Sequence, residues 1–86
     1  PQDLARIEKG EEYIRKRGIK MARLRHYRLP GGLLLARIEV GKKDITKVIS
    51  HKSQVIRKLK TLGYNYVTLD LEGYRTGSMN EGLMRR

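Results

Sequence analysis

The chain has 86 residues, of which 20 are basic and 9 acidic, giving a net charge of +11; hydrophobic residues make up 38%, and Phe and Trp are absent. A chain of this length forms one small domain, and its charge favours anionic partners, namely nucleic acid, nucleotides or phosphorylated small molecules. The lack of cysteine excludes disulfides, thiolate metal sites and cysteine nucleophiles among these residues.

No apolar run approaches the length of a membrane span, and no signal peptide is visible. We therefore expect a cytoplasmic protein with no membrane partner. The chain begins at Pro1 rather than at a methionine, which predicts a processed or cut piece of a longer protein. Residues 1–80 are predicted to form a single small α+β domain, and residues 81–86 a flexible tail.

The first predicted element is a helix over residues 3–17, with Asp3 as its N-cap and Gly18 as its stop. An acidic group that includes Glu11 lies on or beside its apolar face. One interpretation is a solvated face that offsets the basic residues of the last turn. In the other, Glu11 points into a site as a metal-binding or proton-handling carboxylate.

Two strands are predicted next, over residues 19–27 and 33–40, joined by the turn signal Leu-Pro-Gly-Gly at 29–32. Alternation along the first strand places Arg23 and Arg25 next to each other on one face. Two arginines two positions apart can grip a phosphate through charge-assisted hydrogen bonds. Exposed strands also carry arginines routinely, so this pattern alone leaves a surface role open.

The second predicted helix spans residues 45–62, with Asp44 as its N-cap and Gly63 after its end. His51 has no partner at metal-ligand spacing, and His26 in the first strand is interpreted as an ordinary surface residue. The apolar stripe of this helix consists of Ile45, Val48, Ile49, Ile56, Leu59 and Leu62, with Val55 at its border, and the opposite face carries Lys47, Lys52, Arg57, Lys58 and Lys60.

The segments Leu4–Glu8 and Leu35–Glu39 have the same sequence, Leu-Ala-Arg-Ile-Glu. Their flanks differ, because helix-favouring residues follow the first copy and leucines precede the second. We therefore predict no internal repeat: the same five residues should form helix in one place and strand in the other.

Residues 66–71 alternate between apolar and polar side chains, which predicts a third strand with one buried face. The glycines at 73 and 77 then permit a shaped polar loop over residues 73–80. This loop is not a Walker P-loop, because only three residues separate its glycines and no lysine follows. A strand that leaves the domain through a solvated tail is the alternative.

The predicted order is helix, strand, strand, helix, strand, an α+β fold with a three-stranded mixed sheet and two helices on one face. Alternation then gathers polar side chains on the other face of the sheet. They form either cross-strand pairs of small energetic effect or a phosphate- or metal-binding wall that another domain covers. The residues on this face are Arg23, Arg25, Arg37, Glu39, Thr68 and Asp70.

Several of these runs resemble one family. They are Leu-Gly-Tyr at 62–64, Tyr-Val-Thr-Leu-Asp-Leu at 66–71, Gly-Tyr-Arg-Thr-Gly-Ser-Met-Asn at 73–80, Arg-Leu-Arg-His at 23–26 and Ala-Arg-Ile-Glu-Val at 36–40. Together they are similar to the C-terminal end of the ATP-dependent sacrificial sulfur transferases, within the ATP-pyrophosphatase (PP-loop) superfamily. The resemblance covers nearly the whole chain.

The resemblance implies a function for a longer parent protein. Family members adenylylate a carboxylate of a pyridinium mononucleotide with ATP and magnesium, and then transfer sulfur while building a nickel-pincer cofactor. By this resemblance Arg23 and Arg25 match the substrate-phosphate arginines, Glu11 a catalytic or metal-binding carboxylate, and Glu39 a metal ligand. Further candidates are Arg37, Asp70, Arg75, Ser78 and Asn80.

The chain also departs from the family. It contains neither the Ser-Gly-Gly-x-Asp-Ser loop that holds the pyrophosphate of ATP nor the donor cysteine. We therefore expect a substrate-binding and assembly domain that binds no cofactor by itself, is inactive alone, and works with an upstream ATP-binding domain and an anionic nucleotide-like substrate.

Two other classes of function stay open. A free nucleic-acid-binding module would use the basic helix face, although it lacks the usual aromatic platform for stacked bases. An oligomerisation domain would use the open sheet face or the loop at 73–80 against a copy of itself. The resemblance and this second class both lead us to expect a homo-oligomer.

Overall fold

The structure is a computed structural model that describes residues 2–74. Three helices and three strands confirm the predicted α+β class, and none of the helices in this range is long and apolar enough to cross a membrane. Short 3₁₀ turns lie at Pro30–Gly32 and Lys42–Asp44. The elements are α1 (Gln2–Arg15), β1 (Ala22–Arg28), β2 (Leu34–Val40), α2 (Ile45–Ser50), α3 (Lys52–Thr61) and β3 (Tyr66–Leu69).

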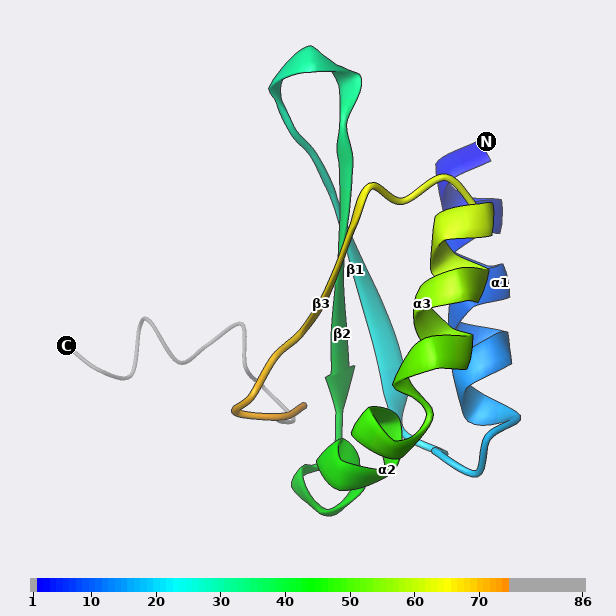
Figure 1. Ribbon diagram of the computed structural model, residues 1–86, viewed down its shortest axis with the longest axis vertical. Coiled ribbons are helices and arrows are strands. Elements are labelled where there is room, and N and C mark those ends of the chain that lie inside the picture. Colours follow the sequence, from blue (N-terminus) through cyan, green and yellow to red (C-terminus); the bar gives the residue numbers. More distant parts are fainter. Residues whose placement is uncertain (1, 75–86) are drawn as a thin grey trace, which may run out of the picture.

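The sheet has the strand order β1-β2-β3. Strands β1 and β2 pair antiparallel with Arg23 opposite Glu39, and β2 and β3 pair parallel with Arg37 opposite Thr68. The parallel pair is connected through α2 and α3, as a crossover requires. Figure 1 shows α1 and α3 side by side on one side of the sheet, and no helix or strand of residues 2–74 covers the other side, which is called the open face below.

The core lies between the two long helices and the first two strands. Gly10 permits their close approach, because a Cβ atom there would lie 2.7 Å from Leu24 and 3.0 Å from Leu59. The fully buried side chains include Ile14 and Ile38. The repeated Leu-Ala-Arg-Ile-Glu sequence is helix in α1 and strand in β2, as predicted.

Several predicted boundaries were wrong. Asp3 lies within the first turn of α1 rather than at its N-cap, and its carboxylate is engaged by Arg28. Strand β1 begins at Ala22, not at residue 19, although Ile19 is buried in the preceding connection. Strand β3 ends at Leu69, because the chain turns after the Asp70 backbone bonds to Ile38. The predicted shared apolar face therefore does not extend to Leu71, which is 77% exposed.

The predicted helix at 45–62 is divided into α2 and α3 by the non-helical backbone of His51 (φ −106°, ψ 19°). Asp44 makes no capping hydrogen bond; its carboxylate lies 3.9 Å from Lys47 Nζ instead. The apolar stripe is also rotated from the predicted one. Val55 is buried, whereas Ile49 and Ile56 are 49% and 41% exposed.

Candidate functional site

The open face of the sheet carries the polar side chains that the sequence placed there. Arg23 and Arg25 come from β1, and Arg37 and Glu39 from β2. They face the same side because alternate residues of a strand share a face, and the register places Arg25 directly opposite Arg37. The sheet therefore presents three arginines and one carboxylate on this face.

Glu39 is the centre of this group. It is only 5% exposed, and its two carboxylate oxygens accept hydrogen bonds from Arg25 Nε (3.0 Å) and Arg37 Nη2 (2.6 Å). A buried charge needs such partners to offset its lost hydration. The carboxylate thus holds two guanidinium groups in place while it neutralises only one of their charges.

The three arginines differ in which of their guanidinium nitrogens contact other groups. Within residues 2–74 the terminal nitrogens of Arg25 make no hydrogen bond, so they can bind an anion. Arg37 also lies 4.0 Å from the carboxylate of Asp70, and its buried Nε has no hydrogen-bond partner in the described part of the chain. Arg23 lies over the ring of Tyr74 at 5.9 Å. Arg23 and Arg25 thus lie on the same face of β1, but their guanidinium groups contact different carboxylates, those of Glu11 and Glu39.

Glu11 lies at the outer edge of β1 rather than beside Glu39 in the centre of the open face. Its Oε2 accepts the Leu24 backbone N–H at 2.8 Å and lies 3.8 Å from Arg23, and its Oε1 accepts Arg15 at 3.2 Å. This carboxylate is neither solvated nor free, since its side chain is 13% exposed. Its predicted catalytic or metal-binding role stays a prediction.

A metal site is not assembled by the described residues alone. Residues 2–74 contain no group of three or more carboxylates or histidines that could hold a metal ion. Both oxygens of Glu11 and of Glu39 contact donors, so either residue would have to exchange a bond to bind Mg²⁺. The metal roles of these two residues therefore stay predictions.

The loop after β3 begins next to the open face. The N–H of Glu72 bonds to Asp70 Oδ1 at 2.9 Å, and the backbone of Tyr74 bonds to Val40. Gly73 is required for this path, because its φ is +83° and a Cβ atom there would lie 3.0 Å from the Val40 carbonyl oxygen. The remaining predicted loop residues, Arg75, Ser78 and Asn80, lie outside the described residues.

The sequence interpretation missed a polar group on the helix side of the sheet. His26 is not an ordinary surface residue: its side chain is 9% exposed, and its Nδ1 lies 2.9 Å from the hydroxyl of Tyr64. Burial raises the pKa of Tyr64, and the hydrogen bond from Arg28 lowers the pKa of Asp3, which lies 3.7 Å from His26 Nε2. The alternation that buries Ala22 and Leu24 could have placed His26 on this side; the full group is Asp3, His26, Arg28 and Tyr64.

No family model matches the chain, but it is similar in sequence to individual known proteins. Over 83 residues, 96% of this chain, it is 35% identical to the pyridinium-3,5-bisthiocarboxylic acid mononucleotide synthase of Lactiplantibacillus plantarum, of which it covers 28%. It is 33% identical over 86 residues to an uncharacterised protein of Synechocystis, covering 30% of that protein. It is 36% identical over 75 residues to an uncharacterised protein of Methanocaldococcus jannaschii, covering 27%. The chain thus spans less than a third of each relative.

Proposed function

We propose that this chain is the C-terminal, substrate-phosphate-binding and assembly part of an ATP-dependent sulfur transferase that acts on a pyridinium mononucleotide. The 35% identity to a pyridinium bisthiocarboxylic acid mononucleotide synthase extends over nearly the whole chain and supports this proposal. A thiocarboxylate differs from a carboxylate by sulfur in place of oxygen, so such a synthase must introduce sulfur. A mononucleotide also brings one phosphate, which needs a cationic site.

The observation that carries the proposal is the pair Arg23 and Arg25 on one face of β1, with Arg25 held by buried Glu39. Because Glu39 holds the Nε of Arg25, the terminal nitrogens of that guanidinium are fixed in direction and can form two parallel hydrogen bonds to a phosphate. Arg23 lies 3.8 Å from Glu11, beyond a short hydrogen bond, so it can turn toward the same anion. These residues bind and orient the substrate; they do not themselves activate its carboxylate.

The rest of the reaction would take place on the parent protein. ATP, with Mg²⁺, would bind in an upstream domain, since the chain has no pyrophosphate-binding loop, and the sulfur would come from outside these residues because they include no cysteine. Glu11 is the candidate proton-handling or metal-binding carboxylate, and Glu39 a candidate metal ligand once upstream residues complete the site. The isolated chain should therefore bind substrate without converting it.

Calorimetric titration of the chain with nicotinic acid mononucleotide, a pyridinium carboxylate with one phosphate, tests the proposal. We expect Arg25→Ala to weaken binding by about 10- to 100-fold, because a hydrogen-bonded charge pair is lost. Arg57→Ala removes the same charge from the exposed face of α3 and should change the affinity by less than about twofold. If the riboside without phosphate binds as tightly as the mononucleotide, the proposed phosphate site is wrong.

Nucleic-acid binding is a second candidate, favoured by a basic hollow of about 630 Å³ beside the start of α2. Lys20, Lys43 and Lys47 line it, although Lys47 also bonds to the Gly18 carbonyl oxygen at 3.2 Å. Binding to a mixed-sequence RNA that weakens steeply between low and moderate salt would support this function. If a variant with Lys20 and Lys43 both changed to Ala still binds the RNA equally well, the hollow is not the RNA-binding site.

A further inference from the structure

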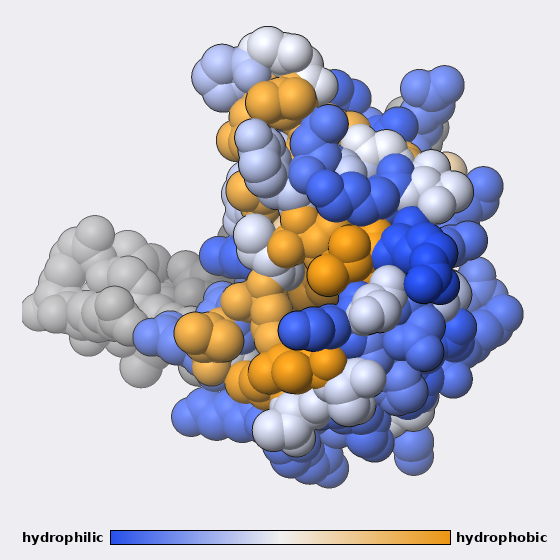
Figure 2. Space-filling view, viewed as in Figure 1, coloured by the Kyte–Doolittle hydropathy of each residue, from blue (hydrophilic) through white to orange (hydrophobic). Residues whose placement is uncertain are grey.

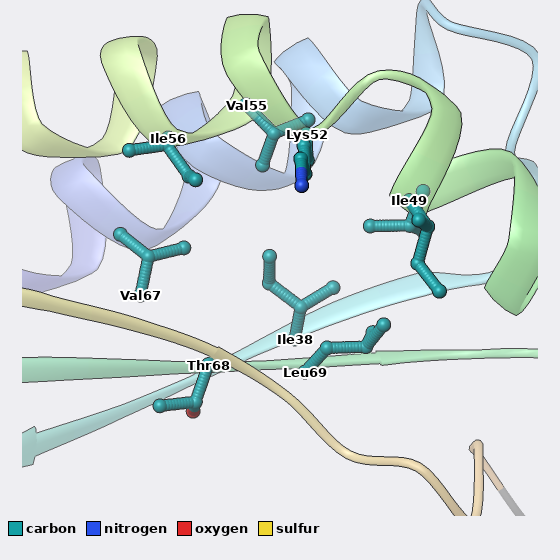
Figure 3. Close-up of a pocket in the computed structure, with 9 residues that line it drawn as sticks. Ile38, Ile49, Lys52, Val55, Ile56, Val67, Thr68 and Leu69 are labelled. Atoms are coloured by element: carbon teal, nitrogen blue, oxygen red, sulfur yellow. The ribbon is translucent and has the colours of Figure 1, made fainter.

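The side chains of β3 alternate between the two sides of the sheet. Figure 3 shows Val67 and Leu69 directed toward the helices and Thr68 directed away from them. The first two line an apolar groove of about 150 Å³, which Ile56 of α3 borders on its other side. Figure 2 shows this groove as part of a hydrophobic strip between the helices and β3. Because alternate residues of a strand share a face, Tyr66 lies with Thr68 on the open face.

Tyr66 belongs to a row of three side chains that crosses the open face at its hairpin end. The register places Leu35 directly opposite Tyr27 on one side and opposite Tyr66 on the other. The two tyrosines are 41% and 49% exposed, and Leu35 between them is partly exposed. The guanidinium of Arg37 lies 5.6 Å from the centroid of the Tyr27 ring, so this ring is on the same face as the arginines. Two aromatic rings beside an aliphatic side chain form an apolar surface, called the tyrosine row below.

The next row along the strands carries positive charge. It consists of Arg25, Arg37 and Thr68, which the register again places side by side. Residues two positions apart on a strand are separated by about 6.6–6.8 Å, which is the spacing between the two rows. The ribose of a mononucleotide spans a distance of this order between the phosphate and the ring. One such ligand can therefore reach both rows.

We propose that the tyrosine row binds the pyridinium ring of the mononucleotide while the neighbouring arginines bind its phosphate, an inference that rests on the function proposed above. A pyridinium ring is flat and positively charged. The faces of tyrosine rings stack on aromatic rings and attract cations, so they suit both properties. Tyr27 and Tyr66 are thereby specificity-determining residues, which select a phosphate ester that carries an aromatic ring.

The balance of charge on the open face favours a ligand with a single phosphate over a nucleic acid. Arg23, Arg25 and Arg37 share this face with the carboxylates of Glu39 and Asp70, so the excess is one positive charge. Nucleic-acid binding depends on the neutralisation of many successive phosphates. Bases of single-stranded RNA also stack on aromatic side chains of a sheet, and RNA is therefore included in the test.

Calorimetric titration with three probes separates the ring site from the phosphate site. The probes are nicotinic acid mononucleotide, ribose 5-phosphate, which lacks the ring, and nicotinic acid riboside, which lacks the phosphate. We expect the mononucleotide to bind at least about fivefold more tightly than ribose 5-phosphate, because stacking on aromatic side chains adds to the phosphate contacts. Tyr27→Ala and Tyr66→Ala should each weaken mononucleotide binding at least about fivefold and leave the affinity for ribose 5-phosphate within about twofold.

Two kinds of control variant accompany these changes. Tyr27→Phe and Tyr66→Phe keep the aromatic ring and should keep the affinity for the mononucleotide within about twofold. Tyr13→Ala removes a tyrosine ring from the helix side of the sheet, where Arg17 lies 3.8 Å from the ring centroid, and should change neither affinity. Binding of ribose 5-phosphate by the alanine variants shows that they are folded.

The outcomes distinguish failure of the ring site from failure of the phosphate site. If the mononucleotide and ribose 5-phosphate bind equally well, or the Tyr27→Ala and Tyr66→Ala variants bind the mononucleotide like the parent chain, the ring site is wrong even where Arg25→Ala weakens binding. Riboside binding that Tyr27→Ala abolishes, with no effect of Arg25→Ala on the mononucleotide, would keep the ring site and reject the phosphate site. Both sites are wrong if no probe binds. A Tyr27→Ala variant that loses affinity for a mixed-sequence RNA but not for the mononucleotide would assign the row to RNA and overturn the proposal.

Discussion

The two edges of the sheet differ in how their backbone is covered. At the β1 edge, residues of α1 occupy the backbone directly: Glu11 accepts the Leu24 N–H, and Arg15 donates to the Ala22 carbonyl oxygen at 3.2 Å. At the β3 edge the backbone of Val67 and Leu69 has no such partner in the described chain. The helices likewise cover β1 closely and leave a groove over β3.

Within residues 2–74, the β1 edge is covered by side chains of α1, whereas the β3 edge is not covered. Natural sheets protect their edges with charges, short strands or covering elements. The β1 strand has both a covering helix and three arginines among its seven residues, whereas within residues 2–74 the uncharged β3 has only its four-residue length as protection. The β3 edge is therefore the less protected of the two in the described chain.

The largest expected difference in the free energy of unfolding is between substitutions of a core residue and of a groove residue on α3. Leu59 is fully buried near Gly10, so Leu59→Ala should lower the free energy of unfolding by about 2–5 kcal/mol. Ile56 lies one turn earlier and borders the groove, and Ile56→Ala should cost less than about 1 kcal/mol in the monomer because less area leaves the interior. Urea unfolding at a dilution that keeps the chain monomeric measures both. Equal losses would mean that the groove is already covered.

A smaller loss of stability is expected when the backbone at the β1 edge loses its side-chain partner on α1. Glu11→Ala should lower the free energy of unfolding by about 1–3 kcal/mol, because the Leu24 N–H loses its partner in a partly buried position. Glu12→Ala on the same helix removes an exposed carboxylate, 3.7 Å from Lys16, and should change stability by less than about 0.5 kcal/mol. Urea unfolding of both variants measures the difference, and a Glu11→Ala variant as stable as Glu12→Ala would show that α1 does not protect β1 through this carboxylate.

Most of the fold could be predicted from the sequence because its signals are local. Alternation and the glycine turn gave the hairpin, and flanking residues separated the helical Leu4–Glu8 from the extended Leu35–Glu39. The break at His51 was missed because no proline or glycine marks it. The exposure of Ile49 and Ile56 was missed as well, because it depends on the sheet ending at β3, which is a tertiary property.

The candidate site was predicted less completely, for a related reason. Alternation placed Arg23, Arg25 and Glu39 on one face, and the structure brings these side chains together as expected. The alternation pattern could not show that Glu39 would be buried beneath two arginines. Nor could it show that Glu11 would bond to the backbone of a strand. Those outcomes depend on side-chain packing between elements far apart in the sequence.

The smallest expected change in stability is at the contact between the start of α1 and the end of β1. Asp3 contacts Arg28 at 2.8 Å and Arg6 at 2.9 Å, with His26 at 3.7 Å, and the hydrogen bond from Arg28 holds the pKa of Asp3 below its ordinary 3.8. A carboxylate with a lowered folded-state pKa adds stability above its unfolded pKa and loses it as the pH falls through the folded value. Asp3→Asn should therefore be less stable than the parent chain near neutral pH, and the difference should shrink in urea unfolding below about pH 4. Arg28→Ala should show the same convergence, and the double variant should add little to either, because both changes remove one interaction. A difference that stays constant with pH would mean that α1 is held to the end of β1 by packing rather than by this charge pair.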